Sequence, residues 1–191
     1  MIAALLLLQA ATPAETPPAY PTNEVLVAFA NACSDLSDMN AVSTRVASQG
    51  WEQFAPAADS QLGALVSIGQ QNVAGGVAGL QYRGTLAGRT LYLALSEAQD
   101  GNSIARGCRL YDFTAPAMPD LATLVPWAGR QPSAQSGGVG AAAHSYSWSP
   151  SALAEAQNET VITFIPADSP LAATVPASGL ALVATQTVPR N

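Results

Sequence analysis

The sequence predicts an α+β fold, in which a mainly antiparallel sheet of about four to six strands carries an N-terminal helical part packed on it. Two observations predict this class. Residues 23–72 carry apolar side chains at helical spacing, with capping residues before them. From residue 81 onward the chain carries β-like runs with turn signals between them. The length of 191 residues suits one domain with a substantial core.

The N-terminus has the pattern of a secretory signal peptide. An apolar run at residues 2–8 is followed by small residues, and cleavage is expected after Ala11 or Ala14. No Lys or Arg precedes the run, so a buried N-terminal helix is the alternative. Residues 15–22 form a Pro-rich spacer and residues 23–191 form the domain, in which no segment is apolar for long enough to span a membrane. We therefore expect a periplasmic or secreted protein.

The first helix is predicted over Glu24–Ala32, with Thr22 or Asn23 as its N-cap. Glu24 lies in the first turn, where the helix dipole favours a carboxylate. Apolar residues at helical spacing continue to Cys33. This periodicity places Cys33 on the buried face of the helix.

Two more helices are predicted before the sheet begins. One is capped by Ser37 or Asp38 and ends near Gly50, after which a short extended piece follows. The other is capped by Asp59 or Ser60. Its inward-facing side chains are expected to be Leu62, Leu65, Val66 and Ile68.

A β-hairpin is the most strongly indicated part of the sheet. Arg89–Ala98 and Ile104–Thr114 are β-like runs, and the segment between them contains Asp100 and Gly101. Asp-Gly between two such runs is typical of a tight hairpin turn. Apolar residues on both faces of the second run predict an interior strand. A further strand is expected at Gln81–Leu86.

The C-terminal part alternates between strands and short helical pieces. Gln131–Ala143 is of low complexity and is predicted to be a flexible loop. Strands are expected at His144–Ser149, Thr160–Ile165 and Gly179–Thr187. Helical pieces are expected at Asp120–Ala128, at Ser151–Ala156 and from Pro170.

Two stretches of the chain resemble each other. Residues 54–62 and 164–171 each carry an aromatic residue, then Pro-Ala, then Asp-Ser-x-Leu at a predicted helix start. A duplicated strand–helix–strand unit would explain the likeness and would give a pseudo-two-fold sheet. The alternative is that both stretches independently use the ordinary chemistry of a helix start.

Cys33 and Cys108 are the two cysteines of the chain, and an even count in an exported protein predicts a disulfide. Closing a loop of about 75 residues would stabilise the fold by about 4–5 kcal/mol. The bridge would tie the first helix to the second arm of the hairpin. Two buried free thiols are the alternative. A metal site is not expected, because His144 is the only histidine.

Charge is sparse throughout the chain. Only 10% of the residues are charged, the formal net charge is −6, and all seven basic residues are Arg. Such a chain is not expected to bind nucleic acid, which requires a clustered basic surface. We expect the basic residues of the hairpin region to be scattered surface charges, with an anion-binding site as the alternative. These residues are Arg83, Arg89, Arg106 and Arg109.

His144 is the one candidate for a catalytic residue, since it is the only imidazole in the chain. A hydrolase built on His144 would need a nucleophile. The sequence contains no Gly-x-Ser-x-Gly elbow and no Lys for serine–lysine chemistry. It contains no nucleotide-binding or metal-ligating motif either, so no cofactor is expected.

These features favour an exported binding or structural module held by one disulfide, whose ligand or partner the sequence does not identify. A hydrolase with a site around His144 is the alternative, and an enzyme is the less favoured class. A third class is a self-associating protein, a homodimer formed through the charge-poor surface.

Overall fold

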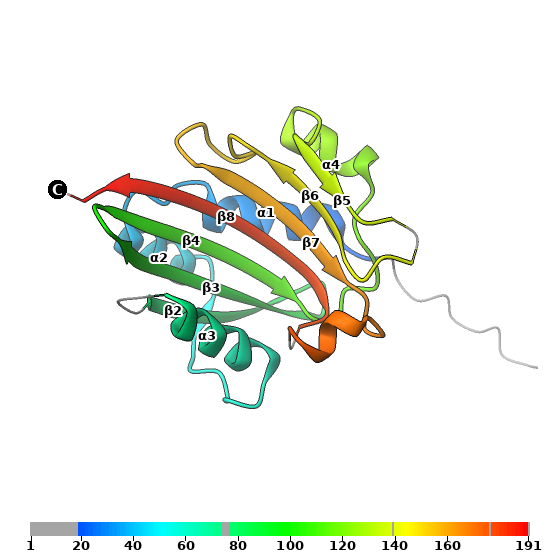
Figure 1. The fold of residues 1–191 in the computed structure, drawn as a ribbon, viewed down its shortest axis with the longest axis horizontal. Coiled ribbons are helices and arrows are strands. Elements are labelled where there is room, and N and C mark those ends of the chain that lie inside the picture. The colour runs from blue at the N-terminus through cyan, green and yellow to red at the C-terminus, as the bar shows by residue number, and fades with distance from the viewer. Residues whose placement is uncertain (1–18, 74–76, 139, 176, 191) are drawn as a thin grey trace, which may run out of the picture.

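An antiparallel sheet of eight strands organises the residues that the computed structural model describes, 19–73, 77–138, 140–175 and 177–190 (Figure 1). The strands are β1 (Glu52–Gln53), β2 (Val77–Leu86), β3 (Arg89–Asp100), β4 (Ser103–Asp112), β5 (Ala134–Ser136), β6 (His144–Trp148), β7 (Glu159–Ile165) and β8 (Gly179–Pro189). The helices are α1 (Thr22–Cys33), α2 (Met39–Ser48), α3 (Gln61–Asn72), α4 (Leu121–Ala128) and the 3-10 turn η1 (Pro170–Ala173). The α+β class is confirmed.

The strand order β1-β2-β3-β4-β8-β7-β6-β5 consists of two four-stranded meanders that meet at β4 and β8. Neighbouring strands within each meander are consecutive in the chain. The two central strands pair antiparallel from Ser103 opposite Pro189 to Asp112 opposite Leu180. β4 therefore lies between β3 and β8 in the interior of the sheet, as its two apolar faces predict.

The expected number of about four to six strands is too low, because two edge strands are very short. β1 pairs only Glu52 and Gln53 with β2, and β5 pairs residues 134–136 with β6. The β5 residues lie within Gln131–Ala143, for which the prediction of a flexible loop is wrong at this point. Every residue of both strands is exposed. Neither strand has a buried face, so hydrophobic alternation could not reveal it.

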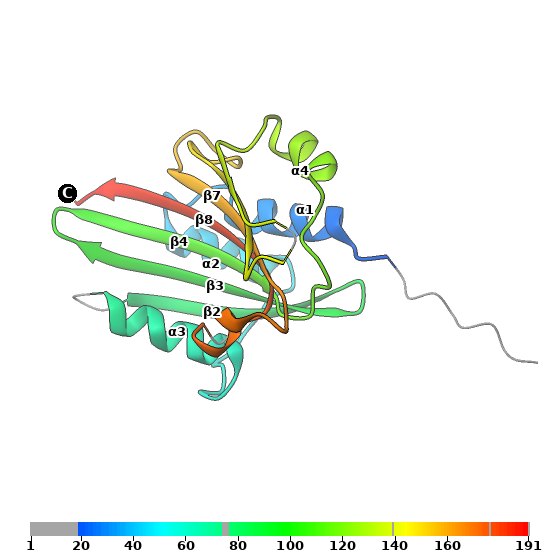
Figure 2. The same ribbon diagram turned by 45° about the vertical axis from the view of Figure 1, so that its right-hand side comes forward.

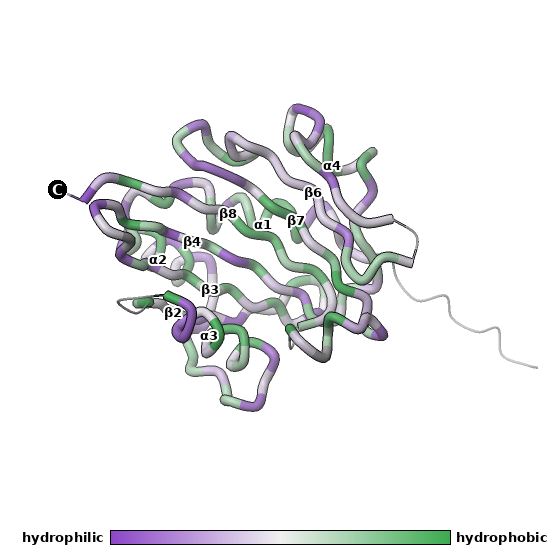
Figure 3. Tube along the Cα trace, in the orientation of Figure 1, coloured by the Kyte–Doolittle hydropathy of each residue, from purple (hydrophilic) through white to green (hydrophobic). Residues whose placement is uncertain are grey.

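Helices lie on both faces of the sheet (Figures 1 and 2). α1, α2 and α4 cover one face, and α3 lies over the opposite face beside β2 and β3. The main core fills the space beneath α1, α2 and α4. It includes Phe29 of α1 together with Leu93, Leu110 and Leu182 from three neighbouring strands. Figure 3 shows hydrophobic residues recurring along these central strands.

Side-chain caps hold the starts of α2 and α3, as predicted. The Asp38 carboxylate accepts the backbone N–H of Asn40 at 2.8 Å, and the Ser60 hydroxyl accepts that of Gly63 at 3.1 Å. The expected cap of the first helix is wrong. α1 begins at Thr22, so this residue lies inside the helix, and a proline takes the cap position without a side-chain hydrogen bond.

The segment Ser151–Ala156 is not helical, contrary to the prediction. The hydroxyls of Ser151 and Thr160 lie 2.6 Å apart and are buried. The Thr160 hydroxyl accepts the backbone N–H of Ala152, and the Ser151 hydroxyl accepts that of Leu153, both at 3.1 Å. These side-chain acceptors replace the carbonyls that a helix would provide.

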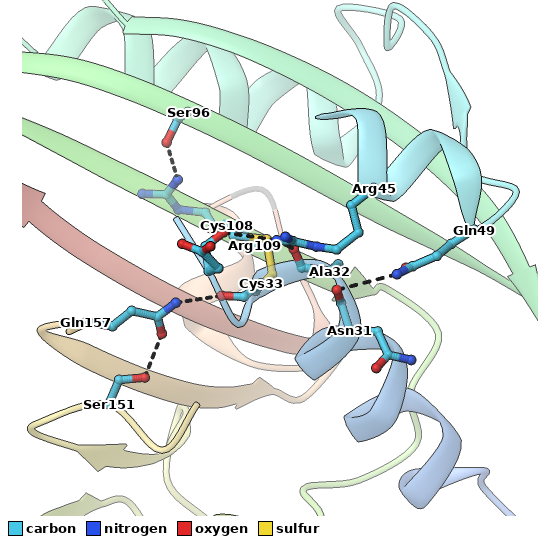
Figure 4. Close-up of a disulfide and its surroundings, with 11 residues drawn as sticks. Asn31, Ala32, Cys33, Arg45, Gln49, Ser96, Cys108, Arg109, Ser151 and Gln157 are labelled. Carbon is cyan, nitrogen blue, oxygen red and sulfur yellow. Dashed lines mark hydrogen bonds between the residues drawn. A yellow bond between two sulfur atoms is a disulfide. The ribbon is translucent and has the colours of Figure 1, made fainter. Parts of the chain in front are cut away.

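A disulfide joins Cys33 at the end of α1 to Cys108 in β4, as predicted, and both residues are fully buried. Their Cα atoms are 5.6 Å apart. In the sheet, Cys108 pairs with Leu95 of β3 and with Ala184 of β8. The bridge therefore fixes the end of α1 to the centre of the sheet (Figure 4).

Side-chain donors occupy the backbone carbonyls around the end of α1 (Figure 4). Arg45 of α2 donates to the carbonyl oxygens of Ala32 and Asp35 at 2.9 and 3.0 Å. Gln157 is buried in the β6–β7 loop and donates to the carbonyl oxygen of Cys33 at 2.6 Å. The last carbonyls of a helix lack partners within the helix. These donors therefore join the end of α1 to α2 and to the loop.

Arg106 of β4 joins the hairpin to the α1–α2 turn. Its guanidinium donates to the carbonyl oxygens of Leu36 and Ser37. The Nε atom also pairs with Glu97 on β3, 2.9 Å from Oε2. The helical layer is therefore attached to the β3–β4 hairpin by this charged group as well as by the disulfide.

A buried ion pair holds the other end of the hairpin. Asp112 is fully buried and accepts Arg89 Nε at 2.7 Å, and it accepts the backbone N–H and the hydroxyl of Thr114 at 2.9 and 2.8 Å. Burial alone would raise the pKa of Asp112. The hydrogen bonds from Arg89 and Thr114 outweigh burial and hold this pKa below its ordinary value. The Arg89 guanidinium also lies 4.9 Å from the ring centroid of Tyr20, just before α1.

The two similar stretches share a local turn, but the architecture does not match a duplicated unit. The hydroxyls of Ser60 and Ser169 each cap the helical turn that follows, at 3.1 Å in both cases. The helices themselves differ, since α3 has 12 residues and η1 has 4. The strand before the helix is β1 at the edge of the sheet in the first stretch, whereas in the second stretch it is β7 in the interior. The two stretches therefore share only the serine cap at the start of a helical turn.

The predicted leader, residues 1–14, and the first part of the predicted spacer lie outside the described residues. Of the helices that the structure does describe, none is long and apolar enough to cross a membrane.

The replacement Asp112→Asn tests the buried ion pair. We expect it to lower the free energy of unfolding at neutral pH by about 2 kcal/mol, because it removes a charge-assisted hydrogen bond. The folded-state pKa of Asp112 is lowered, so this contribution is present above the unfolded pKa of about 3.9 and is lost as the pH falls through the folded pKa. Urea unfolding of both proteins across this range should show the difference shrinking below about pH 4. A difference that stays constant into strong acid would contradict the assignment.

Candidate functional site

α3 covers the second face of the sheet without packing closely on it. Only Leu62 and Gly63, in its first turn, are buried. Leu65 and Val66 are half-buried, and Ile68 is 38% exposed. The side chains predicted to face inward do line the space between the helix and the sheet, but of the four only Leu62 is buried. A cleft of about 320 Å³ lies between the helix and strands β2, β3 and β4.

The cleft exists because small residues form its floor. Gly79 of β2 and Ala94 and Ser96 of β3 line it at positions where longer side chains would fill the space beneath α3. A Cβ atom at Gly79 would lie 2.7 Å from the carbonyl oxygen of Leu95, so a larger residue does not fit there. Apolar side chains of α3 form the roof. Size and lining are those of a site for a small ligand.

Arg109 of β4 brings a positive charge to this cleft. Its Nη1 atom donates to the Ser96 hydroxyl at 2.7 Å (Figure 4). The guanidinium lies against Gly107, where a Cβ atom would come within 2.6 Å of Nη1. Gly107 and Ser96 pair with each other across the hairpin. Together they position the guanidinium at the wall of the cleft.

Arg109 differs from the other three arginines of this region because it lacks a carboxylate partner. Within the described parts of the chain it forms no ion pair, so its positive charge beneath α3 is not neutralised. The expectation of scattered surface charges suits the exposed Arg83, whereas Arg89 and Arg106 are largely buried. The three neutralised arginines are Arg83 with Glu52 at 2.9 Å, Arg89 with Asp112 at 2.7 Å, and Arg106 with Glu97 at 2.9 Å.

Tyr111 lines the same cleft, two residues beyond Arg109 on the same face of β4. Its ring stacks on Phe113, with the ring centroids 5.4 Å apart. Burial raises the pKa of the Tyr111 phenol, and the positive charge of Arg109 opposes this only in part. The phenol therefore stays neutral at physiological pH and does not cancel the charge of Arg109.

His144 lies elsewhere, at the start of β6 on the face that α1 and α4 cover. It is half-buried and pairs across the sheet with Phe164. It lines an open groove with Tyr146 and the segment 116–121, which includes Asp120. In the described part of the chain, no hydrogen bond joins His144 to a serine hydroxyl or to a carboxylate. A catalytic role for His144 stays a prediction.

Four larger hollows between described residues suit a small ligand less well. The groove at His144, of about 440 Å³, is more open. A hollow of about 380 Å³ contains Arg106, whose charge Glu97 neutralises.

The remaining two hollows are larger still. One of about 540 Å³ lies along α1 and is more open, with Val27 and Trp51 in its lining. The other, of about 610 Å³, contains Arg89, whose charge Asp112 already neutralises. Among the residues with described side chains, no group of three or more His, Cys, Asp or Glu is arranged to hold a metal ion.

The cleft escaped prediction from sequence because it depends on strand register. Its two components are the apolar residues of α3 and the small residues of β2 and β3, and the sequence shows both without showing that they face each other. Gly79, Ala94 and Ser96 can be assigned to the α3 side of the sheet only once β2 and β3 are paired. The hydrogen bond between Arg109 and Ser96 depends on the same register across the hairpin.

Comparison with known proteins does not name a family. No protein-family model matches the chain, and no curated protein or solved structure matches it. The functional interpretation therefore rests on the residues and geometry of the cleft.

Proposed function

We propose that this chain is an exported binding protein that holds a small ligand in the cleft between α3 and the sheet. The observation that carries the proposal is the loose placement of α3. A helix with four apolar residues at inward spacing buries only its first turn and leaves about 320 Å³ beneath it. A helix that served only to complete the core would be expected to fill this space, because protein interiors are close-packed.

Export is supported by two independent features. The disulfide between Cys33 and Cys108 is of a kind that persists in oxidising compartments and is rare in the cytosol. The sequence before the domain has the pattern of a leader. A periplasmic or secreted location accounts for both.

Intact-mass measurement of the protein expressed with its own N-terminus tests the export proposal. We expect the mature chain to begin after residue 11 or 14, and to be lighter by two hydrogens than the reduced form. Recovery of the full-length chain with free thiols from the cytosol would contradict it. A chain with the disulfide but with its leader intact would contradict cleavage alone.

Filling the cleft tests the binding proposal. The neutral dye N-phenyl-1-naphthylamine should bind the wild-type protein with a rise in fluorescence. Ala94→Leu should weaken this binding about tenfold or more, because the added side chain occupies the floor of the cleft. Ala98→Leu is the matched control, since Ala98 lies on the same strand and face but outside the cleft. Thermal unfolding should confirm that both variants fold.

Equal dye binding by the wild-type protein and by Ala94→Leu would contradict the assignment of the site. A hydrolase centred on His144 remains the alternative function. It has less support, because the described surroundings of His144 offer it no hydrogen-bonded serine or carboxylate.

A further inference from the structure

We propose that the cleft beneath α3 selects small amphiphilic carboxylates, with the Arg109 guanidinium receiving the carboxylate and the side chains of α3 receiving the apolar part. This inference rests on the proposed binding function and adds the class of ligand. Three features of the cleft support it: an available cation, a fixed position for that cation, and an apolar roof.

The first feature is the unused hydrogen-bonding capacity of Arg109. An arginine side chain has five N–H donors, arranged to meet both oxygens of a carboxylate. The one hydrogen bond found for this guanidinium in the described structure goes to the Ser96 hydroxyl. The other arginines of the region already pair with carboxylates of the protein. Arg109 is the member of this group for which the described residues supply no carboxylate.

The second feature is the preorganisation of the guanidinium. The Ser96 hydroxyl holds Nη1 at 2.7 Å, and the missing side chain at Gly107 leaves room for the group against the β4 backbone. A side chain that is already fixed loses less conformational entropy when it binds a ligand. A freely solvated surface arginine would not need the glycine and the serine in these two paired positions.

The third feature is the apolar surface around this charge. Leu65, Val66 and Ile68 line the cleft from α3, and Ala94 lies on its floor. Leu62 to Gly69 spans about 10 Å of helix, at about 1.5 Å per residue. An apolar ligand of medium chain length matches this span better than a compact inorganic anion. A single cation likewise favours a monoanion, and the net charge of −6 disfavours polyanions.

Titration calorimetry with octanoate and with octan-1-ol tests the ligand class. The two probes have the same alkyl chain and differ in the charged group. Octanoate should bind the wild-type protein more tightly than octan-1-ol does. Arg109→Gln should weaken octanoate binding about tenfold, since charge-assisted hydrogen bonds are lost, and should leave octan-1-ol binding unchanged. Arg83→Gln is the matched control, because it removes a charge from the same face of the sheet and should change neither.

Gly107→Ala is a second variant that keeps the charge. The atoms that its Cβ would meet are the ends of the Arg109 and Ser96 side chains, so the fold should tolerate it while the guanidinium moves away from Ser96. We expect weaker binding of octanoate, with octan-1-ol binding unchanged. This variant keeps the test decisive if Arg109→Gln does not fold.

The outcomes separate this inference from the proposed function. Equal binding of octanoate and octan-1-ol, with no effect of Arg109→Gln or Gly107→Ala, would overturn the carboxylate inference. Binding of the neutral dye that is sensitive to Ala94→Leu would still support the cleft as a binding site. Failure of the dye, octanoate and octan-1-ol to bind would overturn both.

Discussion

The disulfide between Cys33 and Cys108 is the constraint on which the rest of the structure depends. It joins the last residue of α1 to a buried position in the central strand β4. The carbonyls around this point are then occupied by side chains from separate elements, Arg45 of α2 and Gln157 of the β6–β7 loop. Each of these hydrogen bonds requires the end of α1 to lie where the bridge holds it. The bridge therefore positions a group of polar contacts that would otherwise have to order themselves independently.

This anchoring makes the two faces of the sheet unequal. The face beneath α1, α2 and α4 carries the close-packed core and the carbonyl network, and Figures 1 and 2 show the helices gathered there. The opposite face has α3 held mainly by its first turn, above small residues of β2 and β3. Because packing on the first face provides most of the stability, the fold tolerates an unfilled cleft on the second face. The same strand, β4, presents Cys108 to the core and Arg109 to the cleft.

Local signals in the sequence predict much of the fold. The Asp-Gly turn marks the β3–β4 hairpin, and Asp38 and Ser60 mark the starts of α2 and α3. Each of these features is decided by a few neighbouring residues. β5 could not be predicted, because all of its residues are exposed and it carries no hydrophobic alternation. The segment after Ser151 could not be predicted either, because the hydroxyls of Ser151 and Thr160 hold it in a non-helical form that no apolar pattern reveals.

The candidate site is even harder to predict from the sequence than these elements of the fold. The sequence reveals four arginines near one another but not which of them has a carboxylate partner. Glu52 is far from Arg83 in the sequence, and Asp112 is far from Arg89. That Arg109 has no carboxylate partner among the described residues becomes apparent only once the register of β2, β3 and β4 is known. The cleft depends in the same way on which face Gly79 and Ala94 occupy. Electrostatic and steric complementarity across strands is a property of the assembled sheet.

Native-state hydrogen exchange, compared between the wild-type protein and the double variant Cys33→Ser/Cys108→Ser, tests this account most directly. In the wild-type protein, amides of α1, β4 and β8 should exchange only through global unfolding, whereas those of α3 should exchange through a local opening of much lower free energy. Loss of the bridge should lower the free energy of exchange for α1, β4 and β8 together by about 4–5 kcal/mol, and α3 should change little as long as its local opening stays the easier route. An α3 as strongly protected as β4, or an α1 unaffected by loss of the bridge, would contradict the account.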